Sequence, residues 1–306
     1  MQILLLQVHN THVLCSCPFL GRNHTERQFW HLHKRFGASP RDLAGYAGDP
    51  DRYIELLIRE TAAAYPLSHR LLVTEPSQDN RRVPKIAFAS QEVFDLLWSR
   101  YLKNRTAEMA YYYSCFCGTA GAASSARWLF EARIHQLLAR GKTIQIFPIL
   151  GHRAKNSIVY SNYDASRKQK DPVGLRWASS EQCILPEDDS VKLQEGHYYH
   201  LDSNNFLPTI NALLLFRPPD KSPPILLMFR ISQNQEEHDV NPKDLRRVNK
   251  LKFPSDTRKC YVVVTPGGTW PRITIPMEHF QGHHMSPDKF LPVFHLYYPV
   301  PELFKD

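Results

Sequence analysis

The fold of this chain is constrained most by two apolar segments that flank a proline-rich turn. TINALLLF (209–216) and ILLMFRIS (225–232) are rich in residues that favour strands, and RPPDKSPP lies between them. Because proline cannot donate to a β-ladder, the intervening segment is expected to be a turn. PKDLRRVNKLK (242–252) then has helical spacing, and CYVVVTP (260–266) is a β-branched strand suited to burial on both faces.

A helix and a further strand are expected upstream of these segments. ASSARWLFEARIHQLLARG (123–141) begins with serines that can cap a helix, carries an apolar stripe and ends at Gly141. TIQIFPIL (143–150) has the composition of a strand. The second half therefore reads helix, strand, strand, strand, helix, strand. This order predicts an α/β fold with a mixed sheet flanked by helices.

The first hundred residues have mostly helical patterns. Segments 27–37, 52–64 and 90–103 each place apolar residues at helical spacing. EPSQDNRRVP (75–84) has turn composition and is expected to be a linker or an exposed loop. We therefore expect a mostly helical region over residues 1–110 and a second domain over residues 111–306.

Composition narrows the class of protein without fixing its function. The chain has 306 residues and a net charge of +8, which favours an anionic partner such as nucleic acid. Its six cysteines are few for this length, and the CSC and CFC pairs lack the usual zinc spacing, so we expect reduced thiols packed in a core. No secretory signal and no membrane-length apolar run is evident, which predicts a soluble intracellular protein, nuclear or cytoplasmic, without a membrane partner.

Four segments between Gly118 and Pro266 together resemble a known family. They are GTAGAASSARWLFEARIHQLLARG, NNFLPTINALLLF, ILLMFRISQNQEEHDVNPKDLRRV and YVVVTP. They resemble crinkler-type and retrotransposon-hot-spot-like proteins, in which a P-loop ATPase precedes a restriction-endonuclease-like domain of the PD-(D/E)xK kind. HVLCSCPF and the segment after it resemble the end of that ATPase domain, which implies a partial family member. ATP hydrolysis is not expected, because the chain contains no G-x-x-x-x-G-K-[ST] loop.

The resemblance implies a position for an active site. Nucleases of this kind hold Mg²⁺ or Mn²⁺ with a helix Glu and an Asp that opens the second strand, beside an (E/Q)-x-K pair on the third. The matching positions are Glu131, Asn211, Arg230 and Ser232, with Glu131 and Asn211 as the metal ligands if the site is active. An amide lacks the charge of a carboxylate, and a guanidinium has no acceptor and repels a cation. The sequence therefore favours loss of cleavage over its retention.

Each of these residues also has a plain structural interpretation. Glu131 could flank the apolar stripe of an amphipathic helix and form a modest surface pair with His135. Asn211 could secure a loop at the start of a strand. Arg230 could be a charge on an edge strand that prevents aggregation, or it could pair with Glu131 and fill the site.

Basic residues in and after the helix at 242–252 are the expected contacts to nucleic acid, with DNA favoured over RNA. They are Lys243, Arg246, Arg247, Lys250 and Lys252. Neutralisation of phosphates gives binding that is independent of sequence and sensitive to salt. The leading hypothesis is a nuclease-like, DNA-interacting module with impaired or lost cleavage. The alternatives are a solvated basic face without a ligand and a non-enzymatic module that binds nucleic acid or protein.

Overall fold

The protein is described by a computed structural model in which two compact units are distinguished, Met1–Leu129 and Phe130–Lys305. The division falls within helix α7 (Ala123–Ala139), whereas the sequence pattern placed a boundary near residue 110. The structure describes residues 26–37, 42, 45–46, 48–62, 71–76, 84–100, 102, 105–117, 122–141, 143–155, 157–161, 171–178, 181–185, 191–201, 207–220, 222–233, 237–267, 270–276 and 291–304.

The first unit is mostly helical. The three helices expected from apolar spacing are confirmed as α2 (Glu26–Phe36), α4 (Pro50–Ala62) and α5 (Gln91–Arg100), and α6 (Thr106–Cys117) follows them. The segment expected to be a linker instead contributes to an antiparallel pair, β1 (Leu72–Pro76) and β2 (Pro84–Phe88), with Pro76 opposite Pro84. Residues 77–83 between the two strands lie outside the described residues.

Aromatic rings around Phe88 form the centre of the first unit. Its ring lies 5.2 Å from that of Phe94 and 5.0 Å from that of Phe116, which joins β2 to α5 and α6. Contacts of α6 with these elements explain why it belongs to the first unit. The CFC pair was expected in a core, but Cys115 and Cys117 are exposed on α6, and the CSC pair lies outside the described residues.

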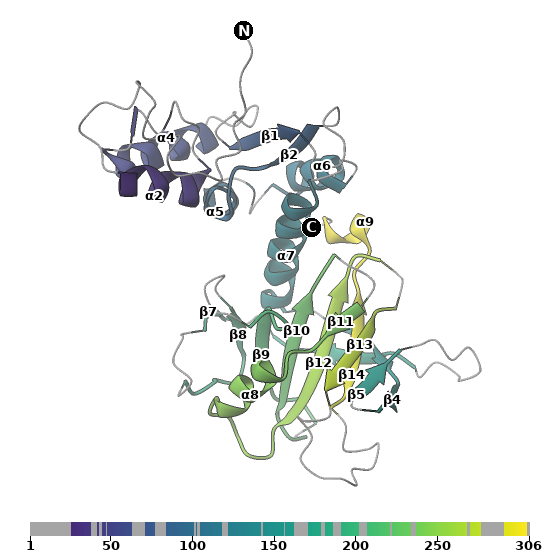
Figure 1. Cartoon of the computed structure of the whole chain (residues 1–306). Coiled ribbons are helices and arrows are strands. Elements are labelled where there is room, and N and C mark those ends of the chain that lie inside the picture. Colours follow the sequence, from purple (N-terminus) through teal and green to yellow (C-terminus); the bar gives the residue numbers. More distant parts are fainter. Residues whose placement is uncertain are drawn as a thin grey trace. The chain divides into compact units, whose positions relative to one another are not determined.

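The second unit contains two sheets and two further helices (Figure 1). Its eight-stranded sheet has the order β6-β3-β14-β12-β10-β9-β8-β7, and its four-stranded sheet has the order β11-β13-β5-β4. The large sheet comprises β3 (Thr143–Ile149), β6 (Val173–Arg176), β7 (Glu181–Ile184), β8 (His197–His200), β9 (Ala212–Phe216), β10 (Ile225–Ile231), β12 (Arg258–Thr265) and β14 (Val293–Tyr297). The small sheet comprises β4 (Gly151–Arg153), β5 (Ser157–Tyr160), β11 (Glu237–Asp239) and β13 (Arg272–Pro276), and the helices are α8 (Pro242–Lys250) and α9 (Val300–Leu303).

The large sheet is mixed, as the alternation of predicted helices and strands indicated. Strands β8, β9 and β10 are successively antiparallel, whereas β10 runs parallel to β12 and β12 runs parallel to β14. Parallel neighbours need a crossover, and α8 lies in the connection from β10 to β12. The first predicted strand, β3, pairs with β14 and β6 and is not a neighbour of β9. Strand β9 instead lies between β8 and β10. The α/β class is confirmed.

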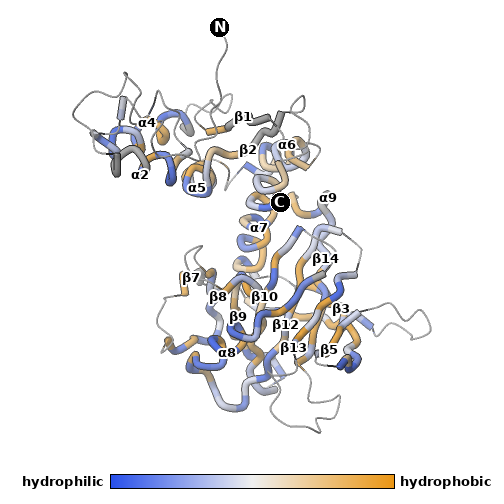
Figure 2. Tube along the Cα trace, viewed as in Figure 1, coloured by the Kyte–Doolittle hydropathy of each residue, from blue (hydrophilic) through white to orange (hydrophobic). Residues whose placement is uncertain are grey.

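Both faces of the central strands are covered by other elements. Leu226 and Met228 of β10 pack in one cluster with Leu245 and Val248 of α8 and with residues of the small sheet. On the other face, the ring of Phe229 lies 6.2 Å from that of Tyr198, which in turn contacts α7. All five residues of β9 are buried, and Figure 2 shows the hydrophobic character of these strands. The expected burial of 260–266 on both faces is borne out for Tyr261–Thr265.

Candidate functional site

Glu131 and Asn211 meet where α7 lies beside the start of β9. Glu131 belongs to α7, and its side chain keeps 23% of its surface exposed. Asn211 immediately precedes β9. Its backbone N–H donates to the carbonyl of Phe229 at 2.7 Å, and its carbonyl accepts from the N–H of Leu201 at 3.1 Å. The backbone of Asn211 is therefore fixed on both sides.

The side chain of Asn211 links two elements through its amide. Its Oδ1 accepts from the backbone N–H of Ile231 at 2.8 Å. Its Nδ2 then faces α7 and donates to Oε1 of Glu131 at 2.5 Å. Because the Ile231 N–H needs an acceptor, the donor end of the amide must point toward the carboxylate. A direct hydrogen bond thus joins the two residues expected to share a metal ion.

This geometry does not fit Mg²⁺ or Mn²⁺. A hard divalent cation needs several oxygen ligands directed at it. Here an N–H donor occupies the approach to Glu131 from Asn211. Within the described parts of the chain, no three His, Cys, Asp or Glu side chains are grouped so that they could hold a metal. The carboxylate of Glu131 is the only charged group of the Glu131–Asn211 pair, and it accepts a hydrogen bond from within the protein.

Arg230 faces the other side of the sheet. Phe229 points toward Tyr198 and α7, and successive side chains of a strand alternate between faces. Arg230 accordingly donates to the carbonyl of Pro208 on the α8 side. There, burial raises the pKa of Tyr261, an effect that Arg230 partly opposes.

Ser232 lies two positions after Arg230 and is buried, and its N–H donates to the carbonyl of Val264 at 3.0 Å. The four predicted residues therefore do not share one pocket. Glu131 and Asn211 are in contact, whereas Arg230 bonds to Pro208 on the opposite face. Arg230 is also not a charge on an edge strand, because β10 lies between β9 and β12.

His135 completes a buried polar cluster around Glu131. It was expected to form a surface pair, but only 3% of the residue is exposed. Its Nδ1 lies 2.6 Å from the hydroxyl of Tyr198, and its Nε2 lies 3.8 Å from Oε1 of Glu131. The ring of His200 is 4.1 Å away. Sequence reasoning missed Tyr198 and His200, although their spacing of two in HYYH places both on one face of a strand.

Tyr198 acts in this cluster as a neutral hydrogen-bonding group. Burial raises the pKa of its hydroxyl well above the ordinary value, and the nearby Glu131 carboxylate raises it further. An ionised phenol is therefore disfavoured at neutral pH. The cluster stabilises the contact between α7 and β8 through the His135 and Tyr198 pair.

Helix α8 is held firmly with one face buried. Asn241 caps its first turn, with Oδ1 accepting from the N–H of Lys243 at 3.0 Å, and Pro242 occupies the first helical position. The only acid in the helix, Asp244, is buried. Its Oδ2 accepts from the N–H and the hydroxyl of Thr209 at 2.8 and 2.6 Å. The single negative charge of α8 is therefore turned inward.

The outer face of α8 carries only cations among its charged side chains, and two exposed lysines lie next to the helix. We call this surface the basic face. It comprises the exposed Lys243, Arg246 and Lys250, the half-buried Arg247, and the exposed Lys252 and Lys192. Lys192 and Lys252 are brought together by a parallel β-bridge between their backbones. The five predicted nucleic-acid-binding residues thus lie on one helix and its C-terminal extension, and Lys192 is a further member that its sequence position did not reveal.

Comparison of the chain with protein-family models, with curated proteins and with solved structures finds no match. The fold and the two sites define an α/β protein with a mixed sheet, a hydrogen-bonded Glu–Asn pair and an exposed basic face. None of the helices in the described ranges is long and apolar enough to cross a membrane.

Proposed function

We propose that this protein is a nuclease-like module that binds DNA through the basic face and does not cleave it with a metal ion. The observation that carries the proposal is the division of charge on α8, where the lone acid is buried and the basic side chains face solvent. Cations arranged on a rigid helix can neutralise phosphates without reading bases. Such binding is independent of sequence and weakens steeply with salt.

The order of elements supports a restriction-endonuclease-like ancestry. From β9 onward the elements run β9, the antiparallel β10, the short β11, α8 and the parallel β12, which keeps the order strand, strand, helix, strand that the resemblance to crinkler-type proteins implies. The strand expected directly after α7 is β3, which lies between β6 and β14 and is not a neighbour of β9. In that comparison Asn211 opens the second strand, where the active family members carry an aspartate.

Loss of cleavage is supported by the internal partners of the predicted catalytic residues. The amide of Asn211 donates to Glu131, so a hydrogen bond takes the place that a cation would occupy between two carboxylates. The positions on β10 that face α7 are the apolar Phe229 and Ile231, and Arg230 bonds to a carbonyl on the opposite side. No residue of β10 on the α7 side can therefore polarise a water molecule.

A charge-reversal experiment tests the binding proposal. K243E/R246E/K250E changes three exposed side chains of the basic face, and K34E/R52E/R59E changes three exposed cations on α2 and α4. Both variants lower the net charge from +8 to +2, so a difference between them reports location and not total charge. We expect the first variant to lose about 100-fold or more in affinity for duplex DNA and the second to change by less than about threefold.

The salt dependence provides an independent check. The slope of log affinity against log salt concentration should fall by about 3 in K243E/R246E/K250E, one phosphate contact for each lost cation. Equal losses in both variants would contradict a specific basic face. If the native protein shows no affinity for DNA at low salt, the proposal fails and a protein with an acidic surface becomes the better candidate partner.

A further inference from the structure

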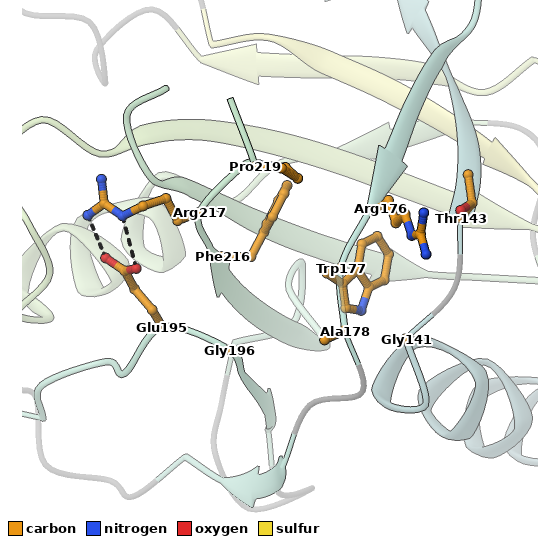
Figure 3. A pocket seen from close by; sticks show the side chains of 10 residues that line it. All are labelled: Gly141, Thr143, Arg176, Trp177, Ala178, Glu195, Gly196, Phe216, Arg217 and Pro219. Atoms are coloured by element: carbon orange, nitrogen blue, oxygen red, sulfur yellow. Dashed lines mark hydrogen bonds and ion pairs between the residues drawn. The ribbon is translucent and has the colours of Figure 1, made fainter. Parts of the chain in front are cut away.

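A separate cavity of about 810 Å³ lies at the end of the large sheet, within the second unit (Figure 3). Its walls come from the connection between α7 and β3, from the end of β6, from the turn before β8 and from the end of β9. Cavities of about 300 to 1,000 Å³ are the usual size for small-molecule ligands. This cavity contains none of the residues of the Glu131 cluster or of the basic face.

One end of the cavity presents an exposed cation beside a hydroxyl. Arg176 of β6 and Thr143 of β3 are directly opposite each other in the antiparallel register, and both line the cavity. Both side chains are exposed, and within the described residues Arg176 has no ion-pair partner. Directly opposed side chains in such a pair are about 5 Å apart at Cβ, so one small anion can contact both. This end suits a phosphate group.

The middle of the cavity is apolar and rigid. Trp177 and Phe216 form its floor, with ring centroids 6.0 Å apart. The indole Nε1 of Trp177 donates to the carbonyl of Leu138 at 2.9 Å, which fixes the ring. Figure 3 shows the two rings between the Arg176 end and the opposite wall. Only 8% of Trp177 and 5% of Phe216 is exposed, so a flat organic group can reach a small part of this floor without a rearrangement of the protein.

The opposite wall offers both donors and acceptors. Arg217 donates through Nε and Nη2 to the two carboxylate oxygens of Glu195, at 3.1 and 2.7 Å. This bidentate pairing leaves the Nη1 amino group and the outer lone pairs of Glu195 available to a ligand. With Arg176 and Arg217 against Glu195, the charged groups of the cavity sum to one positive charge.

We propose that this cavity binds a nucleoside monophosphate, with the phosphate on Arg176 and Thr143 and the base over Trp177 and Phe216. The Arg217–Glu195 pair would bond to the polar edge of the ring. The same phosphate monoester occurs on a free nucleotide and on the 5′ end of a nucleic acid strand. The inference does not depend on DNA binding by the basic face.

Calorimetric titration of the full chain with AMP and with adenosine tests the proposal. We expect AMP to bind at least about tenfold more tightly than adenosine, because only AMP carries the charge that pairs with Arg176. R176Q should lose this preference. The matched control is R153Q, which makes the same change at an exposed arginine of β4, and it should bind AMP like the native protein. T143V should weaken AMP binding by a smaller factor, of a few fold.

Two results would overturn the site. One is an absence of AMP binding at about 5 mM ligand. The other is equal affinity of R176Q and R153Q for AMP, with native thermal unfolding in both. A comparison of 5′-phosphorylated and 5′-hydroxyl oligonucleotides identifies the source of the phosphate: preference for the phosphorylated strand assigns the strand end, and equal binding assigns the free nucleotide. K243E/R246E/K250E leaves the cavity unchanged and should bind AMP like the native protein. AMP binding therefore tests the cavity separately from DNA binding by the basic face.

Discussion

The Glu131 cluster and the basic face differ in what their charged groups contact. The Glu131 carboxylate accepts from the Asn211 amide at 2.5 Å inside the contact of α7 with the sheet, whereas the cations of α8 face solvent. A metal site fails when one ligand loses its charge or its orientation. A basic face tolerates such changes, because its attraction to phosphate needs charge density more than fixed geometry. Binding can therefore persist in a protein that has lost cleavage.

Replacement of Asn211 by aspartate should give the largest effect on the interior site. N211D removes the donor to Glu131 and places two carboxylates in contact, which disfavours the charged form of both. We expect a loss of about 3 kcal/mol in the free energy of unfolding at pH 7, measured with urea. Part of this loss should be recovered below about pH 5, where one carboxyl takes up a proton.

The control for N211D is the same change at an exposed site. Asn249 of α8 accepts from Nζ of Lys259 at 2.6 Å, and an aspartate can accept the same bond. N249D should therefore change stability by less than about 0.5 kcal/mol. Millimolar Mn²⁺ should stabilise N211D more than the native protein, since only the variant has two facing carboxylates. If N211D is as stable as the native protein, Asn211 does not serve as the internal partner of Glu131.

His295 of β14 is a second buried polar group, and it makes the stability of the protein depend on pH. The hydroxyl of Thr265 donates to the carbonyl of Gly267, so its oxygen accepts from Nε2 of His295 at 2.8 Å, which places the proton of the neutral ring on Nε2. Burial, and to a smaller extent the nearby His238, lower the pKa of His295 from 6.5 to about 4. The unfolded chain therefore binds a proton more readily than the folded one.

The stability contributed by a neutral His295 is present above pH 6.5 and is lost as the pH falls toward 4. The predicted loss across this window is about 3 kcal/mol. H295Q keeps a donor for Thr265 but cannot titrate. Urea unfolding at several pH values should show a smaller decrease for H295Q than for the native protein. Parallel curves for the two proteins would show that His295 does not carry this dependence.

The hydroxyl of Tyr198 should make the smallest of these contributions. Y198F removes the partner of His135 Nδ1 but keeps the ring that contacts Phe229. We expect a loss of about 1 to 2 kcal/mol in unfolding free energy, because a buried nitrogen is left without its hydrogen bond. Y297F changes a partly exposed tyrosine on β14 and should have almost no effect. Equal stability of Y198F and the native protein would show that the hydrogen bond between His135 and Tyr198 does not stabilise the fold.

The segments that were predicted correctly have patterns that depend on local chemistry. The proline-rich turn separates β9 from β10, and the spacing of Leu245 and Val248 identifies the buried side of α8. Strands β1 and β2 of the first unit were not predicted. The end of β1 and the start of β2 lie in the segment 75–84, whose composition is typical of turns. The two shortest strands of the described residues, β4 and β11, contain three residues each and carry too little periodicity to be recognised.

The candidate site was only partly predictable because β10 is buried on both faces. In ILLMFRI, apolar residues occur at both parities, so the pattern does not show which side chains face α7. The resemblance placed Arg230 and Ser232 beside Glu131, and strand alternation in the folded sheet directs Arg230 to the opposite face. The burial of His135 and its contact with Tyr198 depend on two segments that are far apart in sequence, which local spacing cannot predict.

The most direct test of the account is the affinity for duplex DNA measured with and without EDTA at two salt concentrations, together with a cleavage assay. We predict binding that falls about tenfold or more between low and physiological salt and is unchanged by EDTA. We also predict no cleavage with Mg²⁺ or Mn²⁺, and the same result for E131A. Chelator-sensitive cleavage by the native protein that E131A abolishes would contradict the account.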